Sequence, residues 1–287
     1  MAEHAITLAD WRREAAARLA AVADADSADA EARWLIEHVL ALSTTRLILA
    51  EPQSLADADR DALEQTLARR LSGVPLAQII GTADFGALTL KVSPDVLIPR
   101  ADTEILVQTA LAAFGAERAL RLIDLGTGSG AIALMLADAR PAWQITATDR
   151  STAALAVARD NATALGLGRV TFIESDWFTS LGDQRFDVVV ANPPYIDAED
   201  AHLVALTHEP RQALVAADHG LADLAAIAAA APNHLRPGGG LFVEHGHDQG
   251  EAVRALLVAA GFSSVATRPD HAGRDRVTGG LLNRGHE

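Results

Sequence analysis

Hydrophobic side chains in the first part of the chain recur every three or four residues, the spacing of an amphipathic helix. Charged residues and alanine fill most positions between them, so each helix has one face of large apolar side chains to bury. Gly73 follows the last periodic segment and is a helix stop signal. The pattern predicts a small all-α bundle over residues 1–75, with helices near residues 8–22, 27–40 and 57–71.

The pattern changes beyond this bundle. Short β-like runs punctuated by Gly81 and Gly86 predict a β-hairpin linker over residues 76–95. From residue 96 to 287 apolar strands alternate with helical segments, which is typical of a parallel sheet covered by helices. Strands are expected at 120–125, 144–148, 170–174, 186–191 and 240–244, and helices at 131–139, 153–165 and 221–235. The predicted fold class is therefore α/β, a doubly wound, Rossmann-like domain.

The composition is that of a folded protein, with 287 residues of which 49% are hydrophobic and 22% are charged. Cysteine is absent, which excludes disulfide scaffolds, thiolate metal sites and cysteine nucleophiles. No apolar run approaches the ~18 residues of a membrane span. Met1 to Asp10 carry acidic residues where a secretory signal would carry basic ones. We expect a cytoplasmic protein that does not enter a membrane.

The charge balance bears on the choice of partner. The chain has 24 Lys and Arg residues against 38 Asp and Glu residues, a formal net charge of −14. A protein that binds long nucleic acid is expected to present a basic face to the phosphates, so stable nucleic-acid binding is not expected. His245 and His247 have no third ligand at metal spacing, and no metal site is predicted.

A glycine-rich loop lies where the first predicted strand gives way to a helix, the place where open α/β sheets bind nucleotides. Glycines there let a ligand approach the backbone. Asp149 ends the next strand, where a carboxylate can accept hydrogen bonds from both hydroxyls of a ribose. An adenosine-containing cofactor is implied, but the loop also satisfies the dinucleotide pattern and leaves an NAD-dependent oxidoreductase open. The loop residues are Gly126, Thr127, Gly128, Ser129 and Gly130.

Three further residues favour a sulfonium cofactor. Asp124, just before the glycines, could meet the charged amino-acid part of such a cofactor through water or backbone. Asp176 and Trp177 follow the third strand, where the acid could hold the adenine amine and the indole could cover its ring. Turn formation and plain core packing are the alternative explanations for these side chains.

The segment Asn192-Pro193-Pro194-Tyr195 follows the fourth predicted strand, beside the glycine loop. Proline lacks an N–H and restricts its predecessor, so the turn is stiff and leaves carbonyl groups free to accept. Asn192 and the Pro193 carbonyl could accept both hydrogens of a planar –NH2 group, while Tyr195 lies against its plane. Such a grip would orient a poor nucleophile toward an electrophilic methyl group. We therefore predict Asn192, Pro193 and Tyr195 as catalytic residues and the whole segment, including Pro194, as substrate-binding, rather than a rigid surface turn.

Several segments spread over nearly the whole chain together resemble the HemK/PrmC family of release-factor glutamine methyltransferases. Ala101 departs from the proline usual in the first of them, which leaves the role of Arg100 open. The matching segments are residues 97–104, 124–130, 175–178, 192–196, 209–214, 244–246 and 275–277.

The resemblance implies a class I S-adenosylmethionine-dependent methyltransferase domain over 96–287 and a substrate-recognition role for residues 1–75. It implies S-adenosylmethionine contacts at residues 126–130, Asp149, Trp177 and Asn192. The implied substrate is the side-chain amide of the glutamine in the Gly-Gly-Gln motif of class I peptide chain release factors. We expect the protein to act on this partner as a monomer.

The residues alone do not choose between a glutamine amide and the amino group of adenine or cytosine. Enzymes that methylate these bases use the same Asn/Asp-Pro-Pro-Tyr logic after flipping the base out of the helix, and the net charge of −14 argues against this alternative. An NAD-dependent oxidoreductase would leave the proline turn unexplained. A non-enzymatic binding module would have no use for an intact Asp149 and Asn192.

Overall fold

The computed structural model describes residues 6–23, 27–115 and 118–283. The chain divides into two compact units, Met1–Gly81 and Thr82–Glu287. The predicted boundary at residue 75 falls inside the first unit, and the hairpin predicted as a linker begins the second one. Within the part of the chain that is described, no helix is both long and apolar enough to span a membrane.

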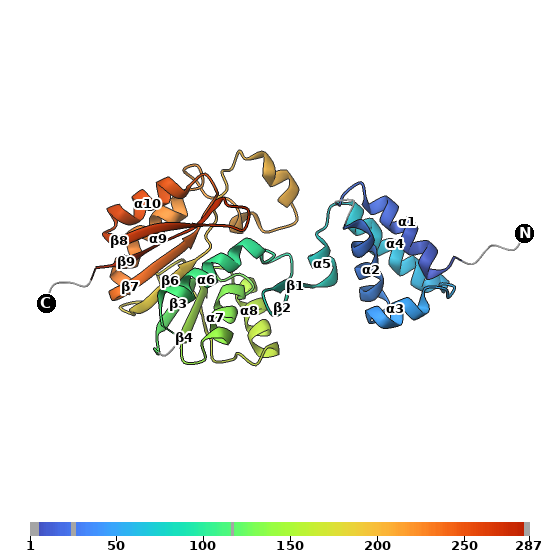
Figure 1. The fold of residues 1–287 in the computed structure, drawn as a ribbon, viewed down its shortest axis with the longest axis horizontal. Coiled ribbons are helices and arrows are strands. Elements are labelled where there is room, and N and C mark those ends of the chain that lie inside the picture. The colour runs from blue at the N-terminus through green and yellow to red at the C-terminus, as the bar shows by residue number, and fades with distance from the viewer. Residues whose placement is uncertain (1–5, 24–26, 116–117, 284–287) are drawn as a thin grey trace, which may run out of the picture. The chain divides into compact units, whose positions relative to one another are not determined.

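The first unit is a helical bundle, as the periodicity predicts (Figure 1). Trp11, Leu35 and Leu63 come from three different helices and are almost fully buried in one core. The Trp11 indole N–H donates to Glu64 Oε1 at 2.7 Å, so the large side chain is buried with its polar atom satisfied. The helices are α1 (Leu8–Leu19), α2 (Ala28–Val39), α3 (Thr44–Ala50), α4 (Asp57–Leu71) and α5 (Leu76–Ile80).

The second unit opens with the predicted hairpin, β1 (Thr82–Phe85) and β2 (Leu88–Lys91), and continues into a seven-stranded sheet. The sheet order is β5-β4-β3-β6-β7-β9-β8, in which β9 runs antiparallel to both of its neighbours. The strands are β3 (Arg121–Leu125), β4 (Gln144–Asp149), β5 (Thr171–Glu174), β6 (Phe186–Ala191), β7 (Leu235–Glu244), β8 (Phe262–Pro269) and β9 (Asp275–Leu282). The helices are α6 (Glu104–Ala113), α7 (Ala131–Ala139), α8 (Thr152–Ala164), α9 (Ala222–His234) and α10 (Gly250–Ala259).

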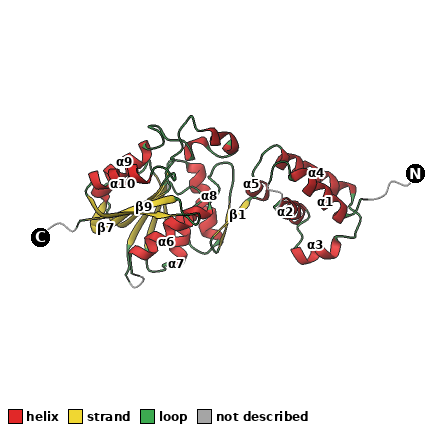
Figure 2. Cartoon of the chain, turned by 45° about the horizontal axis from the view of Figure 1, so that its top comes forward, coloured by secondary structure: helices red, strands yellow, loops and turns green. Residues whose placement is uncertain are grey.

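Helices cover both faces of this sheet (Figure 2). Side chains alternate along a strand, and in β6 Val188 and Val190 join a core with α6 and α7, whereas Val189 and Ala191 join a core with α9 and α10. Because both faces are buried, the central strands are apolar throughout rather than alternating. The structure therefore confirms the predicted α/β fold with an N-terminal helical bundle.

The sequence pattern did not reveal α3, α5, α6, α10, β8 and β9. The hairpin linker predicted over residues 76–95 is wrong at its start, because Leu76–Ile80 form a one-turn helix after Pro75 and the hairpin spans only Thr82 to Lys91. Strand β8 is an edge strand with alternating partly exposed positions, so its apolar signal is weak. Strand β9 is buried but contains Gly279 and Gly280, which interrupt a strand pattern. A Cβ at Gly279 would lie 2.2 Å from the Phe242 ring, so this glycine is required by close packing.

Candidate active site

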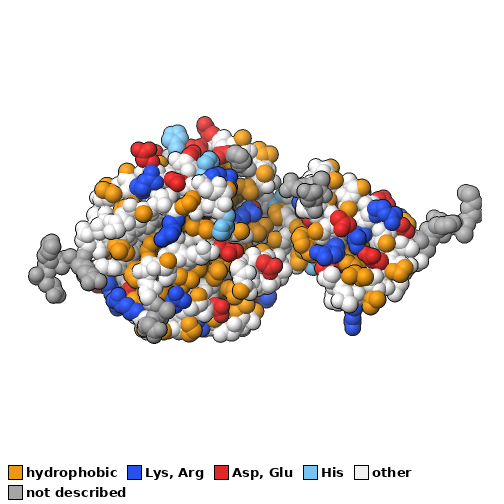
Figure 3. Space-filling view, viewed as in Figure 1, with side chains coloured by type: hydrophobic (Ala, Val, Ile, Leu, Met, Phe, Trp, Pro, Cys, Tyr) orange, Lys and Arg blue, Asp and Glu red, His pale blue; other side chains and the backbone are white. Residues whose placement is uncertain are grey.

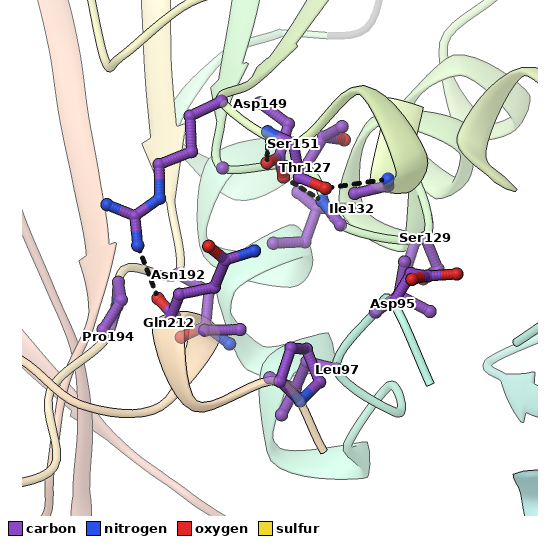
Figure 4. A pocket seen from close by; sticks show the side chains of 18 of the residues that line it. Asp95, Leu97, Thr127, Ser129, Ile132, Asp149, Ser151, Asn192, Pro194 and Gln212 are labelled. Carbon is purple, nitrogen blue, oxygen red and sulfur yellow. Dashed lines mark hydrogen bonds between the residues drawn. The ribbon is translucent and has the colours of Figure 1, made fainter. Parts of the chain in front are cut away.

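Loops that follow β3, β4, β5 and β6 meet at the carboxyl edge of the sheet and line one pocket (Figure 4). Parallel strands end at the same edge, which is why residues far apart in sequence come together here. The predicted residues in this lining are Gly126, Thr127, Gly128, Ser129, Asp149, Asp176, Trp177, Asn192 and Pro194. Pro193 and Tyr195 line a second, adjoining pocket, and Gly130 lines neither.

The glycines of the loop after β3 have different structural roles. Gly126, Gly128 and Gly130 have φ of 70°, 54° and 86°, a region that side-chain-bearing residues rarely adopt. A Cβ at Gly128 would have no described atom within 4 Å, so its backbone faces open space in the pocket. A Cβ at Gly130 would lie 3.0 Å from Leu134 and 3.2 Å from Ala158. Gly130 thus permits close packing behind the loop instead of lining the pocket.

Asp124 lies beneath this loop, fully buried and outside the pocket lining. Thr127 Oγ1 donates to Asp124 Oδ2 at 2.6 Å. Burial raises the pKa of Asp124 to about 7, against hydrogen bonds from Thr127 and the Ala133 amide that favour the charged form. Its contacts fix the loop from behind, and the structure gives it no direct access to a bound cofactor.

Asp149, at the end of β4, is half-buried and aims into the pocket. Its Oδ2 accepts from the Gly128 N–H at 2.9 Å and its Oδ1 accepts from the Ser151 N–H at 2.8 Å. A carboxylate has about four acceptor positions, so two remain for a ligand. The two amides hold the carboxylate in one orientation before any ligand arrives.

Trp177 forms one wall of the pocket. Its φ is +45°, which is strained for an aromatic residue, and its ring would lie 3.2 Å from a Cβ at Gly126. A hydrogen bond from Trp177 lowers the pKa of the Asp223 carboxyl, whereas burial, the larger effect, raises it. Asp176 also lines the pocket with an exposed side chain. Both residues therefore line the pocket, and the adenine contacts predicted for them stay a prediction.

The second pocket has a volume of about 280 Å³ and lies against Pro193, Tyr195 and Glu244. Asn192 lines both pockets, as does Arg100. The Asn-Pro-Pro-Tyr segment therefore stands between two spaces, one on the side of the glycine loop and one on the side of β7. A group held in the second pocket can meet a ligand of the first pocket at Asn192.

Three contacts hold the Tyr195 end of this segment. Its carbonyl oxygen accepts from Gln249 Nε2 at 3.0 Å, and its hydroxyl donates to Glu244 Oε1 at 3.3 Å. A Cβ at Gly220 would lie 2.1 Å from the Tyr195 carbonyl oxygen, so this approach is open only to glycine. The turn is therefore supported from Gln249 at the start of α10, from the end of β7 and from the loop before α9.

Glu209 ties the segment around Arg100 to the loop after the proline turn. Its Oε2 accepts from the Ile98 N–H at 2.9 Å, and its Oε1 accepts from the Arg100 guanidinium. Ala101 begins a short 3₁₀ turn just after Arg100. Arg100 thus keeps a defined partner and a place in both pockets although Ala101 stands where proline is usual.

Several residues of the site received no role from the sequence. Thr103, Glu209 and Glu244 fall within the segments quoted for the resemblance, but a segment match does not say what each side chain contacts. Asn161 fell outside them; it accepts from the Lys91 N–H at 2.7 Å and donates to Ser129 O at 2.9 Å, joining β2 to the glycine loop. A polar residue on the buried side of α8 was the signal available for it.

Comparisons with family models agree with this architecture. The Methyltransferase small domain model matches residues 101–266, and the PrmC N-terminal domain model matches residues 10–81. Among solved structures, a methyltransferase from Pyrococcus furiosus has a TM-score of 0.54 at 18% identity, covering 77% of this chain and 99% of that one. A T. thermophilus 16S rRNA methyltransferase in complex with AdoMet and guanosine has a TM-score of 0.53 at 21% identity, covering 70% and 50%. These likenesses show a shared methyltransferase fold.

Curated relatives resemble the chain over almost its whole length. A release factor glutamine methyltransferase of Bordetella pertussis is 49% identical over 88% of this chain and 94% of the relative. Proteins of the same name from Salmonella typhimurium and Escherichia coli are 45% and 43% identical, covering 94% and 93% of this chain and 97% and 96% of the relatives. The suspected resemblance is thus confirmed: this chain belongs to the release factor glutamine methyltransferase family, and it is a methyltransferase.

Proposed function

We propose that this protein transfers a methyl group from S-adenosylmethionine to the side-chain amide nitrogen of a glutamine in a class I peptide chain release factor, within the Gly-Gly-Gln motif. The observation that carries the proposal is the position of Asn192, which lines both the pocket of the glycine loop and the second pocket. Methyl transfer needs the donor and the acceptor to meet at one point, and Asn192 stands at that point.

The first pocket fits S-adenosylmethionine, the methyl donor that goes with this family. The open backbone at Gly128 lets a ligand approach closely, and Asp149 has acceptor positions left for the two ribose hydroxyls. Trp177 offers a ring face for adenine, and the exposed Asp176 carboxylate can accept from the adenine amine. Bound in this orientation, the cofactor supplies an electrophilic methyl group on a sulfonium.

The chain's own residues act on the other reactant. Asn192 Oδ1 and the Pro193 carbonyl accept the two hydrogens of the glutamine –NH2 group, and Tyr195 packs along the plane of the amide. This grip turns the nitrogen lone pair toward the first pocket, away from the amide's own π system. In the transfer, the nitrogen would gain the methyl carbon as the carbon–sulfur bond breaks with its electron pair left on the sulfur, and the nitrogen would give up one proton to water.

Methylation of adenine or cytosine uses a similar planar –NH2 group and is the competing proposal. The net charge of −14 disfavours it, because a nucleic acid substrate requires contacts to phosphates. On the face drawn in Figure 3 the Lys and Arg side chains are scattered among acidic and hydrophobic ones. That face therefore offers no continuous basic track.

Mass spectrometry of a purified release factor, incubated with this protein and S-adenosylmethionine, tests the proposal. One methyl group should map to the Gly-Gly-Gln glutamine, and a release factor with alanine at that glutamine should gain none. Parallel incubations with ribosomal RNA and with DNA distinguish the alternative. Methyl incorporation there, with none on the release factor, would show that the substrate is a base.

For the first unit we propose recognition of the folded release factor. Ile48 and Leu49 on α3 are 60% and 71% exposed, an unusual place for two adjacent large apolar side chains. Replacing both by serine should raise KM for the release factor several-fold and leave S-adenosylmethionine affinity unchanged. Val258→Ser, at a position 60% exposed on α10, is the matched control and should leave KM unchanged. An unaltered KM in the double variant would contradict this role.

A further inference from the structure

The Asn192 side chain has a polar partner behind it that the transfer reaction itself does not explain. Asn192 Nδ2 lies 3.2 Å from Thr103 Oγ1. Thr103 ends the 3₁₀ turn of residues 101–103 and is buried, with 5% of its surface exposed. A threonine hydroxyl can both donate and accept, so this contact alone does not determine which end of the Asn192 amide faces it.

Glu244 determines which way the Thr103 hydroxyl points. This carboxylate at the end of β7 is 1% exposed and lines the second pocket together with Asn192 and Tyr195. The Tyr195 hydroxyl donates to Oε1 at 3.3 Å, and hydrogen bonding from the Thr103 and Tyr195 hydroxyls favours the charged form of this carboxylate. Among the described residues Oε2 has no partner at normal hydrogen-bond distance. An ionised carboxylate only accepts, so the Thr103 hydroxyl can pair with Glu244 only as the donor.

The direction of the hydrogen bond between Thr103 and Asn192 follows from counting donors and acceptors. With its proton directed at Glu244, Thr103 presents only lone pairs to Asn192, and it can pair only with the amide nitrogen. Asn192 Oδ1 then faces away from Thr103. We propose that Thr103 and Glu244 are positioning residues, which hold the Asn192 amide with its oxygen toward the substrate –NH2 group. The inference rests on the proposed function, because only a substrate that donates two hydrogens needs this orientation.

Charged groups on neighbouring elements leave Glu244 available for this task. Arg276 of β9 is the cation that acts on Glu244, but its Nη2 pairs with Asp270 Oδ2 at 3.2 Å and with Asp102 Oδ2 at 3.4 Å. Asp102, in the turn before α6, repels Glu244, while Arg276 and the hydroxyls attract its charged form. Burial outweighs these effects and raises the pKa of Glu244 to about 7.

A protonated Glu244 can donate as well as accept, so it no longer fixes the direction of the Thr103 hydroxyl. Thr103 can then accept from the carboxyl group and turn its own proton toward Asn192, which would favour the amide oxygen at that contact. The rate should therefore fall as the pH drops through about 7. The hydrogen bonds from Glu244 through Thr103 to Asn192 form what we call the relay. Burial also raises the pKa of Asp124 to about 7, but Asp124 lies outside the relay. The contribution of Glu244 must therefore be isolated by a variant that interrupts the relay.

Thr103→Val cuts the relay with little change of shape. We expect kcat for release-factor methylation to fall roughly 10- to 100-fold, the effect of a mispositioned reacting group, with KM for S-adenosylmethionine and thermal unfolding close to wild type. Thr103→Ser keeps the hydroxyl and should recover most of the rate and its fall below pH ~7, whereas Thr103→Val should show a weaker pH dependence. Thr109→Val is the matched control, because it removes a buried hydroxyl that donates to Ile105 O within α6.

The outcomes separate this inference from the proposed function. A wild-type protein that methylates the release factor, with Thr103→Val equally fast or slowed only through KM, would overturn the relay alone. A Thr103→Val variant that keeps the full wild-type pH dependence would do the same. A wild-type protein that places no methyl group on the release factor would overturn both statements.

Discussion

Gly220 offers a sharp perturbation of the proline turn, because it touches the turn without entering either pocket. It has φ of +82°, and a Cβ built there would lie 2.1 Å from the Tyr195 carbonyl oxygen and 2.7 Å from the Tyr195 carbonyl carbon. Backbone atoms cannot rotate away as a flexible side chain can. Gly220→Ala must therefore displace the turn that carries the substrate grip.

The size of the displacement can be worked out from these distances. Moving the Tyr195 carbonyl oxygen from 2.1 Å to the 3.0 Å below which Cβ contacts are essentially never seen requires a shift of about 0.9 Å. A misplacement of about 1 Å at a reacting group can cost on the order of 100-fold in rate. The left-handed conformation itself adds roughly 1 to 2 kcal/mol of destabilisation for alanine. We expect kcat to fall about 100-fold, and stability to fall modestly.

Gly261→Ala separates the two effects. Gly261 has φ of +89°, and a Cβ there would meet no described atom within 4 Å. It follows α10 at the opposite edge of the sheet from the pockets. Both variants should lose stability in thermal unfolding through the left-handed conformation, Gly220→Ala somewhat more because of its contact with the Tyr195 carbonyl group. In single-turnover methylation at saturating cofactor only Gly220→Ala should be slow. Equal rates for the two variants would refute the argument that Gly220 supports the turn.

Two further results are expected. Asp149→Ala should weaken S-adenosylmethionine binding, measured by calorimetry, by about 1.5 to 3 kcal/mol, the size of a lost hydrogen bond to a charged group. Wild-type protein that binds NAD tightly and does not bind S-adenosylmethionine would contradict the assignment. Glu244 has a pKa raised from 4.5 to about 7, so its protonated form stabilises the fold fully below the unfolded value, and this stability is lost as the pH rises through about 7. From about pH 5 to about pH 8, the unfolding free energy of wild type should drop roughly 2 to 3 kcal/mol more than that of Glu244→Gln, as measured by denaturant titrations. Equal drops in the two proteins would show that Glu244 does not titrate in this range.

Periodicity and turn signals were sufficient to predict the two-part organisation and the central strands. The apolar run of β6 is unbroken because both of its faces are buried, and the glycine loop and proline turn each follow such a strand. Their convergence at one edge follows from parallel topology. These features are encoded locally, which is why the sequence suffices for them.

The support around the site depends on contacts between distant residues. Glu209 meets Ile98 across 111 positions, and Asn192 meets Thr103 across 89 positions. A buried acid such as Glu244 looks like any other polar residue at the end of a strand until its neighbours are known. The need for glycine at position 220 arises from the Tyr195 carbonyl, which no local pattern reveals.

The central claim is that Asn192 grips the substrate amide, and its most direct test is the methylation rate of Asn192→Ala on a purified release factor at saturating S-adenosylmethionine. The account predicts a fall of roughly 100-fold or more, as for the loss of a preorganised polar group, with cofactor affinity only modestly altered. Asn192→Asp, which still accepts hydrogen bonds but adds a charge, should also be impaired. Asn233→Ala, an exposed asparagine near the end of α9, should behave as wild type. A wild-type rate in Asn192→Ala would contradict the account.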